Sequence, residues 1–565
     1  MNTFERKAWL HSYAEHVPHE IEVQTESLVD MIDIAVATYR RDVALEFFGA
    51  TTSYESMGDQ IARAAEGLRR LGVNAGDRVA LVLPNCPQHV VAFYAVLRLG
   101  AIVVEHNPLY TARELRHQFE DHGARVAIVW DKVHDTVSGF PADIRLDHIV
   151  SVDLTAALPF GKRLALRLPV TKARTARAAM TATPSARRVY TWDRLLDHKP
   201  IAKRHPRPRT SDTALLQYTS GTTGSPKGAI LTHENLRANA AQGRAWVPGL
   251  KPGKEVFYGV LPLFHAYGLT LCLTFAMSIG ARLVLFPRFD VDLVLAAART
   301  SPATFLPAVP PIYDQLARAA ESRGVDLSSI RFAISGAMSL PVETVERWEK
   351  VTGGLLVEGY GMTESSPVAL GNPIGPSRRP GTVGVPFPST DIRVVDPDNP
   401  QVLRGEGEAG ELLVRGPQVF QGYWRNPEET AATLMSDGWL RTGDIVTVSP
   451  DGFVTVVDRV KELIITGGFN VSPSEVEAAM LAHPDVTAAA VVGLPHAHGG
   501  EEVSAAVVLR SGARFDPGAM RDFCRETLAG YKVPKRIVVL DDLPRSLIGK
   551  VVRRQVRDAL LAVRS

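Results

Sequence analysis

The alternation of apolar and polar positions predicts a chain in which strands and helices take turns. Residues 52–71 have the apolar spacing of a helix, and an apolar run at residues 79–83 follows them after two glycines. A second helix at residues 89–99 and a second strand at residues 101–105 complete a βαβ unit. Further apolar runs typical of strands lie at residues 126–130, 214–218, 282–286 and 331–335. This repeated pattern predicts a mixed α/β architecture built on mainly parallel sheets.

Toward the C-terminus the pattern changes to that of a smaller unit. A turn at residues 450–452 joins two short apolar runs, and the charged run at residues 458–462 ends the second. Ser472 to Glu475 has the pattern of a capping box, which predicts a helix start. Strands are predicted at residues 487–492, 503–509 and 537–540, and a helix at residues 520–528. A chain of 565 residues is too long to fold around one compact core. We therefore expect a large N-terminal α/β domain with several subdomains, residues 1–460, and a small α+β domain, residues 461–565.

One apolar stretch, residues 260–285, approaches the length of a membrane span. Pro262, His265 and two glycines interrupt it, so we predict buried core instead. The net charge of +2 argues against a nucleic-acid partner. The N-terminus lacks the apolar core of a signal peptide, and three widely spaced cysteines indicate neither disulfides nor a metal cluster, so we expect a cytoplasmic protein.

A basic insertion at residues 159–210 stands apart in composition. Its first part holds eight Lys and Arg residues and no acidic residue before Asp193, with Leu164, Leu166 and Leu168 interleaved. One interpretation is a basic amphipathic surface that makes peripheral contact with anionic lipid on the inner face of the membrane. The other interpretation is a solvated, poorly ordered insertion.

The stretch from Tyr218 to Gly228 has the composition of a phosphate-binding loop. Its glycines let the backbone approach a ligand closely, its hydroxyls add donors, and its lysine adds a cation. Because a helix is predicted at residues 234–242, we expect a loop that joins a strand to a helix. A flexible surface loop is the other interpretation, and Pro226 before the lysine departs from the Walker A pattern. The candidate phosphate ligands are Thr219, Ser220, Gly221, Thr222, Thr223, Gly224 and Lys227.

Four other motifs carry residues suited to chemistry on ATP. His265 follows an apolar strand, and Tyr360 offers an aromatic face to a flat ring. Glu364 is a hard oxygen ligand of the kind that Mg²⁺ prefers. Asp444 can accept hydrogen bonds from both hydroxyls of a ribose, and Lys550 follows a glycine. Taken singly, each motif also fits ordinary packing, a turn or a surface charge.

Together, and in this order, the motifs resemble those of the adenylate-forming enzymes, the superfamily of acyl-CoA synthetases, luciferases and peptide-synthetase adenylation domains. The resemblance implies that His265 lies beside the reacting carboxylate and that Lys550 reaches the α-phosphate, where a fixed cation stabilises developing charge. It implies a Mg²⁺ site at Thr219 and Glu364 and a phosphate contact at Thr363. The implied adenine and ribose contacts are Gly336, Ala337, Gly359, Tyr360, Gly361, Asp444 and Arg459.

Within the superfamily the chain resembles the fatty-acid–CoA ligases. ATP converts the acid to acyl-AMP and pyrophosphate, and the thiol of CoA then displaces AMP. In relatives the small domain swings about a hinge between these steps, and Lys461 matches the hinge position. The loop brought in for the CoA step is matched by Gly467, Gly468 and Phe469. Acetate-using relatives carry a tryptophan at the Gly361 position, so Gly361 and the apolar residues 269–275 favour a medium- or long-chain acid.

Other activities stay open at this point. A fatty acyl-AMP ligase would pass the adenylate to a carrier protein, and a CoA ligase could instead take an aromatic acid. A luciferase-type oxygenase is disfavoured because Ile465 replaces its lysine. A peptide-synthetase domain would need a carrier partner. A non-catalytic protein would be expected to have lost one of the motif residues. A homodimer is also left open.

Overall fold

The chain folds into two compact units in a computed structural model. The larger unit comprises residues 9–391 and 414–440, and the smaller unit comprises residues 1–8, 392–413 and 441–565. The predicted domain boundary between residues 460 and 461 falls within the smaller unit and stays a prediction. The structure describes residues 3–22, 25–186, 188–219, 226–459, 462, 464–466, 469–495, 501–528, 530–546 and 549–563.

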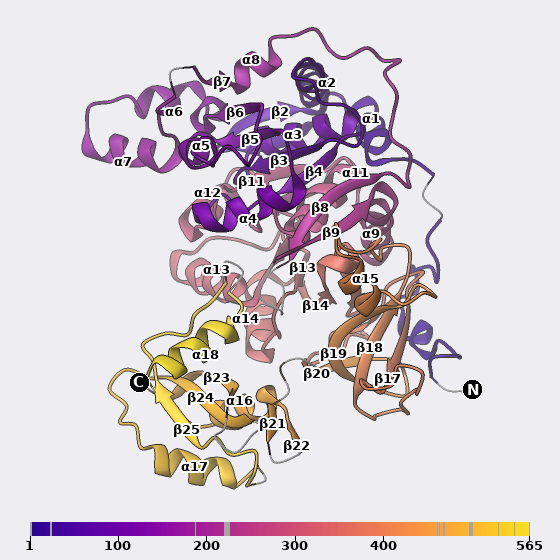
Figure 1. Ribbon diagram of the computed structural model, residues 1–565, viewed down its shortest axis with the longest axis vertical. Helices are drawn as coiled ribbons and strands as arrows, with labels where there is room; N and C mark the ends of the chain where they lie inside the picture. The colour runs from indigo at the N-terminus through magenta and orange to yellow at the C-terminus, as the bar shows by residue number, and fades with distance from the viewer. Residues whose placement is uncertain are drawn as a thin grey trace. The chain divides into compact units, whose positions relative to one another are not determined.

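One of the two sheets of the larger unit has seven strands (Figure 1). Its order is β7-β6-β5-β3-β4-β8-β9, in which β9 is antiparallel to β8 and the other neighbours are parallel. The strands are β3 (Arg78–Val82), β4 (Ile102–Glu105), β5 (Val126–Trp130), β6 (His148–Val152), β7 (Tyr190–Thr191), β8 (Thr213–Thr219) and β9 (Lys227–Thr232). The predicted βαβ unit is therefore confirmed.

The other sheet of the larger unit has nine strands. Its order is β16-β15-β14-β13-β12-β10-β11-β1-β2, with a parallel centre and antiparallel strands at both edges. The strands are β1 (Val43–Phe47), β2 (Ala50–Ser53), β10 (Val256–Gly259), β11 (Arg282–Leu285), β12 (Phe305–Ala308), β13 (Phe332–Ser335), β14 (Leu355–Gly361), β15 (Val368–Gly371) and β16 (Val385–Pro386). The predicted class, α/β with mainly parallel sheets, is confirmed.

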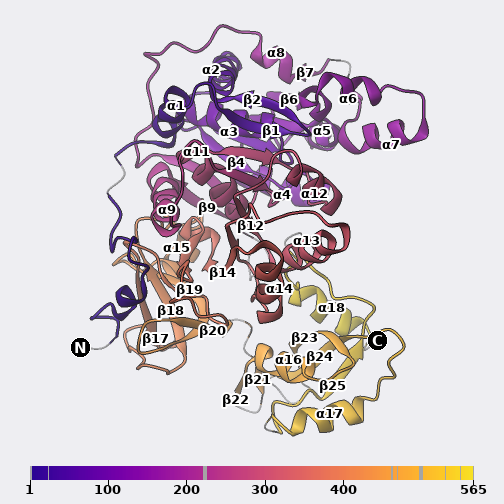
Figure 2. The ribbon, with the colours of Figure 1, turned by 180° about the vertical axis from the view of Figure 1, so that it is seen from behind.

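Helices fill the space between the two sheets and cover their outer faces (Figure 2). The helix α3 (Pro87–Arg98) contacts β1 of one sheet and β3 and β4 of the other, and each of its residues from Gln88 onward is buried. The other helices of this unit are η1 (Ala8–Ser12), α1 (Leu28–Thr38), α2 (Tyr54–Arg70), α4 (Ala112–His122), α5 (Asp131–Ser138), η2 (Leu154–Ala157), α6 (Phe160–Ala165), α7 (Thr171–Met180), α8 (Trp192–Leu196), α9 (His233–Trp246), α10 (Ala266–Gly268), η3 (Leu269–Thr274), α11 (Phe275–Ser278), α12 (Val291–Ala298), α13 (Pro310–Arg323), α14 (Val342–Thr352), η4 (Thr363–Ser365) and α15 (Pro427–Thr433).

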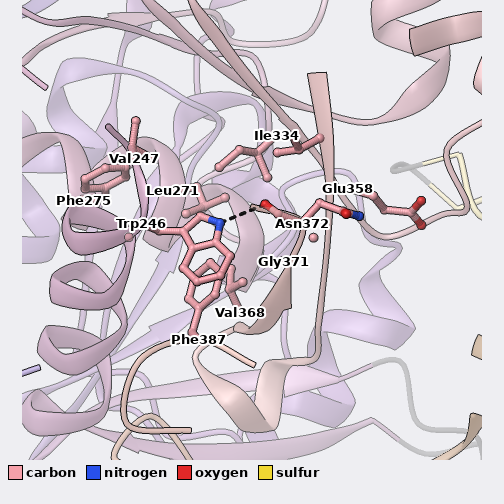
Figure 3. Close-up of a pocket in the computed structure, with 13 residues that line it drawn as sticks. Trp246, Val247, Leu271, Phe275, Ile334, Glu358, Val368, Gly371, Asn372 and Phe387 are labelled. Atoms are coloured by element: carbon pink, nitrogen blue, oxygen red, sulfur yellow. Dashed lines mark hydrogen bonds between the residues drawn. The ribbon is translucent and has the colours of Figure 1, made fainter. Parts of the chain in front are cut away.

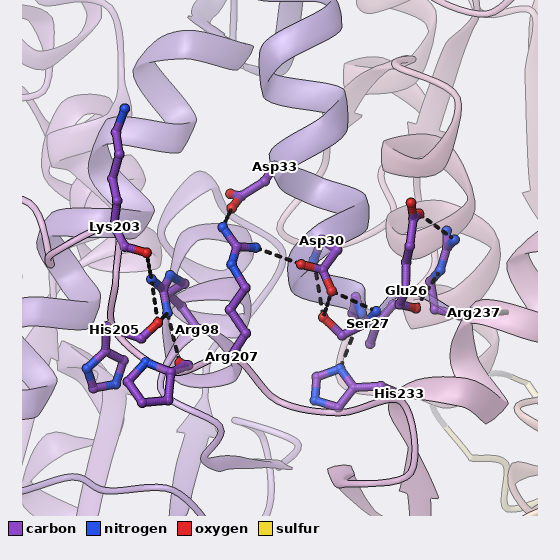
Figure 4. Close-up of polar contacts among 12 residues, drawn as sticks. Glu26, Ser27, Asp30, Asp33, Arg98, Lys203, His205, Arg207, His233 and Arg237 are labelled. Atoms are coloured by element: carbon purple, nitrogen blue, oxygen red, sulfur yellow. Dashed lines mark hydrogen bonds and ion pairs between the residues drawn. The ribbon is translucent and has the colours of Figure 1, made fainter.

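A polar network ties the start of α1 to distant segments of the larger unit (Figure 4). Ser27 caps the helix, since its hydroxyl accepts a hydrogen bond from the Asp30 backbone N–H and the Asp30 carboxylate accepts one from the Ser27 N–H. Arg207, near the end of the basic insertion, donates to Asp30 at 2.8 Å. The Leu28 N–H donates to Nδ1 of His233 on α9 at 3.3 Å. The C-terminal end of the insertion is therefore anchored to the start of α1.

The apolar stretch at residues 260–285 lies inside the larger unit. It contains α10, η3, α11 and β11, and every residue from Leu269 to Phe275 is buried. The prediction of buried core is confirmed. Across the described ranges, none of the helices combines the length and the apolar character that a membrane crossing requires.

The smaller unit carries three sheets. A four-stranded sheet has the order β17-β18-β19-β20, a two-stranded sheet pairs β21 with β22, and a three-stranded sheet has the order β23-β24-β25. The strands are β17 (Asp391–Val395), β18 (Gly410–Arg415), β19 (Leu440–Val448), β20 (Val454–Arg459), β21 (Ile464–Thr466), β22 (Phe469–Val471), β23 (Val486–Pro495), β24 (Glu501–Leu509) and β25 (Arg536–Val539). The helices are α16 (Pro473–Leu481), α17 (Pro517–Arg525) and α18 (Arg553–Ala562).

Side chains on the two faces of β24 build the core of this smaller unit. Val503 and Val507 point into an apolar cluster with residues of α16 and α17, whereas Ala506 points into a second cluster with Val556 of α18. This alternation is that of a strand covered by helices on both faces. The Ser472 hydroxyl caps α16 as predicted, because it accepts a hydrogen bond from the Glu475 N–H.

Candidate active site

The carboxyl ends of strands from both large sheets meet in the larger unit. The side-chain amide of Asn85, which follows β3, donates to the carbonyl oxygens of Gly259 and Leu261 at 3.0 and 2.7 Å, at the end of β10. The side chain of Gln217 on β8 donates to the carbonyl of Phe264 at 2.8 Å. Ligands of α/β folds bind outside the carboxyl ends of the strands, so this edge is the candidate site.

The predicted phosphate loop joins two antiparallel strands. Thr219 at the end of β8 lies opposite Lys227 at the start of β9, and α9 begins only after β9. The prediction of a strand-to-helix loop is therefore wrong. Residues 228–232 were too short a run to predict as a strand, but pairing with β8 buries Ala229 and Leu231. The candidate ligands outside the described residues are Ser220, Gly221, Thr222, Thr223 and Gly224.

Lys227 is held from two sides at the base of this hairpin. Its ammonium forms an ion pair with the carboxylate of Glu429 on α15, and it lies 5.4 Å from the centre of the Tyr423 ring. Only 11% of the Lys227 side chain is exposed. A cation this poorly solvated depends on a nearby anion and an aromatic face for its stability.

Glu364 lies in η4, directly after β14, and is buried with 6% of its surface exposed. The Tyr423 hydroxyl donates to its Oε1 at 2.6 Å, and the Phe420 N–H donates to its backbone carbonyl at 2.9 Å. Burial and then the Glu364 carboxylate raise the pKa of Tyr423 far above its usual value, so the hydroxyl keeps its proton. Tyr423 therefore links the candidate metal ligand Glu364 to the candidate phosphate ligand Lys227.

The segment that carries Tyr423 pairs with β9 as a short extra strand. The Gln421 N–H donates to the Ile230 carbonyl at 3.0 Å, and the Ile230 N–H donates to the Gly422 carbonyl at 2.9 Å. Sequence analysis missed both Tyr423 and Glu429. About two hundred residues separate them from Lys227, and such distant pairing leaves no local periodicity to find.

His265 caps α10 with its own ring. Nδ1 accepts a hydrogen bond from the Tyr267 N–H at 3.3 Å, which leaves the proton of the neutral ring on Nε2. Desolvation lowers the pKa of His265 to about 4. The ring is therefore neutral at pH 7 and can donate one hydrogen bond without contributing a positive charge.

The predicted adenine contacts Gly336 and Ala337 follow β13 at the same edge. The Tyr267 hydroxyl donates to the carbonyls of Ala308 and Ile334, at 3.1 and 2.6 Å, and a Cβ on Gly336 would lie 3.1 Å from the Tyr267 ring. Ala337 is exposed and has φ of +68°, a left-handed conformation that an alanine rarely adopts. The backbone at this strand end is thus fixed in an unusual geometry.

Gly359, Tyr360 and Gly361 form the end of β14, where it pairs with β15. A Cβ on Gly361 would lie 1.8 Å from the carbonyl oxygen of Pro367, so only glycine fits without a backbone shift. Glycine at this position is therefore explained by backbone packing alone. Its predicted role in keeping the acyl pocket open stays a prediction.

An apolar cavity lies between α9, η3 and the end of β14 (Figure 3). Leu271 and Phe275, from the apolar run after His265, line it, whereas Leu269 and Leu273 of the same run are buried in the core. The space is narrow, so a long chain would require lining side chains to move. The other lining residues are Gly243, Trp246, Val247, Ile334, Val357, Glu358, Gly359, Val368, Gly371, Asn372 and Phe387.

In the smaller unit, the two predicted ribose contacts lie opposite each other. Asp444 on β19 is paired in register with Arg459 on β20. Asp444 is buried, and its N–H donates to the hydroxyl of Thr442 at 3.1 Å. The predicted hairpin turn between these strands is present, with the Gly452 N–H donating to the Ser449 carbonyl at 2.8 Å.

In the smaller unit, Lys550 follows a turn that is closed by the Gly549 N–H, which donates to the Ser546 carbonyl at 2.8 Å. The Ser546 N–H donates to the Lys550 carbonyl at 2.7 Å, and the Lys550 N–H donates to the Ser546 hydroxyl at 3.2 Å. Gly549 has φ of +78°, which the turn requires. The hinge candidate Lys461 and the loop residues Gly467 and Gly468 lie outside the described residues, and Phe469 begins β22.

Family comparison agrees with this distribution of motifs. A family model described as AMP-binding enzyme matches residues 32–424, and one described as AMP-binding enzyme C-terminal domain matches residues 475–550. The chain belongs to the AMP-binding enzyme family. This membership confirms the predicted resemblance to the adenylate-forming enzymes.

Named relatives of this AMP-binding enzyme include CoA ligases. It is 38% identical over 562 residues to a long-chain-fatty-acid–CoA ligase of Bacillus subtilis (strain 168), which covers 98% of both chains. Its fold is similar to ATP-bound MatB from Rhodopseudomonas palustris, with TM-score 0.80, 29% identity and coverage of 96% and 100% of the two chains. It is also similar to the anthranilate CoA ligase AuaEII in complex with anthranoyl-AMP, with TM-score 0.80, 26% identity and coverage of 96% and 99%. The predicted resemblance to AMP-forming acid–CoA ligases is confirmed.

Glu358 is expected to make the stability of this AMP-binding enzyme depend on pH. Figure 3 shows its carboxylate pointing away from Trp246, and its Oε2 accepts a hydrogen bond from the Leu340 N–H at 3.3 Å. Burial raises the pKa of Glu358 from 4.5 to about 7. Between these values the folded protein holds a proton that the unfolded chain releases, so the stabilisation is complete below pH 4.5 and is lost as pH rises through 7.

We expect Glu358→Gln to remove this dependence. The amide keeps an acceptor for Leu340 and carries no charge, so the unfolding free energy of the wild type should fall by roughly 3 kcal/mol relative to the variant between pH 4.5 and pH 8. Thermal melting at pH 5 and pH 8 measures this, with the exposed Glu343→Gln as the control. Equal pH dependence of the Glu358→Gln variant and the wild type would contradict the prediction.

Proposed function

We propose that the protein is an AMP-forming fatty-acid–CoA ligase that converts a medium- or long-chain fatty acid, ATP and CoA to acyl-CoA, AMP and pyrophosphate. The observation that carries the proposal is the link made by Tyr423 between a buried carboxylate, Glu364, and a poorly solvated cation, Lys227. This cluster lies at the edge of an AMP-binding enzyme where parallel strands end, in the unit that also holds an apolar cavity.

In the first step an oxygen of the fatty-acid carboxylate attacks the α-phosphorus of ATP. The bond from that phosphorus to the bridging oxygen breaks, and pyrophosphate leaves with the electron pair. In this proposal, phosphate oxygens replace the carboxylate of Glu429 on the Lys227 ammonium, which is already oriented. The neutral His265 donates from Nε2 to the acid. The remaining phosphate contacts are Thr219, Ser220, Gly221, Thr222, Thr223, Gly224 and Thr363.

Mg²⁺ fits the residues present at Glu364 and Thr219. Among the residues that the structure describes, no group of three or more acidic, histidine or cysteine side chains could hold a metal. Magnesium in nucleotide sites is bound by one or two protein oxygens together with phosphates and water, so a single buried carboxylate and a hydroxyl suffice. When bound, the ion neutralises charge on the phosphates.

In the second step the CoA sulfur attacks the acyl carbon of acyl-AMP. The carbon–oxygen bond to AMP breaks, AMP leaves with the electron pair, and the thiol proton is released. Lys550 serves the first step at the α-phosphate, whereas Phe469, with Gly467 and Gly468, serves the second after motion about Lys461. Asp444 and Arg459 hold the ribose. The adenine ring is held by Gly336, Ala337, Gly359, Tyr360 and Gly361.

The direct test is pyrophosphate release from ATP with fatty acids of increasing length, with and without CoA. Release that increases with chain length and turns over repeatedly only with CoA, with acyl-CoA formed, supports the proposal. A single burst that CoA does not change indicates a fatty acyl-AMP ligase. Activity with aromatic acids alone indicates an aromatic-acid ligase, the second candidate, which the likeness to the anthranilate CoA ligase AuaEII favours.

Gly243 on α9 offers a test of the cavity as the acyl site. Its Cβ position lies 3.5 Å from the Phe275 ring, so a side chain there enters the cavity without meeting backbone. We expect Gly243→Leu to lower kcat/KM for long acids by about tenfold or more, since each excluded methylene forfeits about 0.8 kcal/mol, and to spare short acids. Chain-length profiles measure this. The control is Ala245→Leu, half-buried on the same helix and outside the lining. Uniform loss across all chain lengths would contradict the assignment.

The proposal also covers the pathway, the location and the oligomeric state of the protein. We expect the enzyme to act in lipid metabolism in the cytoplasm, with peripheral contact to the inner face of the membrane, and we leave a homodimer as a proposal. Light scattering of the purified full chain measures the oligomeric state.

A further inference from the structure

The helix α6 and the residues that join it to α7 expose apolar side chains at the edge of the larger unit. Phe160 is 81% exposed, and Leu164, four residues later on the same helical face, is 57% exposed. Leu168 and Val170, between the two helices, are 52% and 51% exposed. These four large apolar side chains lie within eleven residues and are called the apolar patch below. So much exposed hydrocarbon in a short segment is unusual for a surface that faces only water.

Basic residues lie between these apolar residues along the chain and continue into α7. No acidic residue occurs from Leu154 to Trp192. In the part of the insertion that the structure describes, the six basic side chains of residues 160–178 form no ion pair, so their charge is uncompensated at short range. They are Lys162, Arg163, Arg167, Lys172, Arg174 and Arg177. The surface thus combines excess positive charge with exposed hydrocarbon.

The segment that contains α6 and α7 is hydrogen-bonded to the rest of the larger unit near both of its ends. The Lys162 ammonium donates to the Phe48 carbonyl at 2.8 Å, and the Trp130 indole N–H donates to the Met180 carbonyl at 2.8 Å. Lys132 also donates to the Ala178 carbonyl at 2.8 Å. In both Figure 1 and Figure 2, α6 and α7 extend beyond β6 and β7 with no other element over them. A tethered, ordered surface agrees better with docking than with a loose solvated insertion.

We propose that Phe160 to Arg177 is a docking surface for a bilayer that contains anionic phospholipid. Lys and Arg attract acidic headgroups, while Phe160, Leu164 and Leu168 enter the boundary between headgroups and acyl chains. A nucleic acid would use the charge but would leave the exposed aliphatic side chains without an apolar partner. If the proposed function is correct, docking places the enzyme where its poorly soluble acid substrate accumulates.

Vesicle flotation with the full chain tests this surface. We expect binding to vesicles of equal parts phosphatidylcholine and phosphatidylglycerol, weak binding to phosphatidylcholine alone, and a loss of binding as salt rises. Arg163→Glu with Arg167→Glu and Arg174→Glu should weaken binding at least tenfold. Phe160→Ser with Leu164→Ser and Leu168→Ser should also weaken vesicle binding. The binding that remains should be more sensitive to salt than that of the wild type.

The matched control reverses three exposed bases elsewhere, Lys251→Glu, Lys254→Glu and Arg510→Glu, with the same change in net charge. Unchanged binding of this control supports the proposal. The docking proposal would be overturned if the patch variants bound vesicles as the wild type does. It would also be overturned if the wild type bound both kinds of vesicle equally, bound neither, or bound duplex DNA instead. An apolar variant that only changes the oligomeric state would overturn it as well.

Activity on a dispersed short acid in solution separates this proposal from the proposed function. The patch lies outside the ATP and acyl residues, so all three variants should retain that activity. Retained activity with retained vesicle binding overturns the docking surface alone. Absent activity in the wild type overturns the proposed function and leaves the vesicle result to stand by itself.

Discussion

Lys550→Ala is expected to slow acyl-AMP formation by about 100- to 1,000-fold, because it removes the cation that we propose acts at the α-phosphate in the step that develops charge there. Thioester formation from ready-made acyl-AMP and CoA should stay almost unchanged, since in the proposed function Lys550 serves the first step and other residues serve the second. Single-turnover assays of the two half-reactions measure the difference. The substitution leaves the turn intact, because the contacts of residue 550 with Ser546 are made by its backbone.

Lys532→Ala is the matched control for this prediction. Lys532 lies in the same unit and forms an ion pair with Glu475, so its loss removes one lysine without touching the turn. Both half-reactions should remain near wild type. Equal slowing of both half-reactions in Lys550→Ala would mean that Lys550 supports the fold or general binding instead of the adenylation step.

Glu364→Gln is expected to lower the rate of the first half-reaction by about a hundredfold and to raise the Mg²⁺ concentration needed for half-maximal rate. The amide oxygen can still accept the hydrogen bond from Tyr423, so the local packing is kept while the negative charge is lost. Pyrophosphate release measured across a Mg²⁺ titration tests both parts. A lower rate with an unchanged Mg²⁺ requirement would argue against Glu364 as a metal ligand.

Tyr423→Phe should give a smaller effect of the same kind, about tenfold in the Mg²⁺ requirement, because the carboxylate of Glu364 loses the group that orients it. Tyr258→Phe is its control. Tyr258 is also buried and also donates to one oxygen, the Ser301 carbonyl at 2.8 Å, but it lies within β10. The control should lower stability without moving the Mg²⁺ requirement, which separates positioning of the ligand from loss of a buried hydrogen bond.

The local pattern of apolar and polar residues was sufficient to predict many of the helices and strands and the α/β fold class. Alternating apolar runs and helical periods predicted the strands β3, β4, β5, β8, β11 and β13 and the small C-terminal unit, because burial of one face imposes a period that a single segment carries by itself. The interruptions at Pro262 and His265 were likewise enough to separate buried core from a membrane span. The order of the motifs along the chain then predicted the family.

Contacts between distant segments were decided only by the tertiary structure. Tyr423 and Glu429 contact Lys227 because residues 421–424 pair with β9. The segment β9 is itself a strand because it pairs with β8. Glycine is required at position 361 because the carbonyl of Pro367, directly before the facing strand β15, leaves no room for a Cβ. These features depend on which surfaces meet, and a short segment has the same local sequence whether or not a partner pairs with it. The sequence alone therefore predicted where the candidate ligands lie along the chain, and packing determined which side chains hold them.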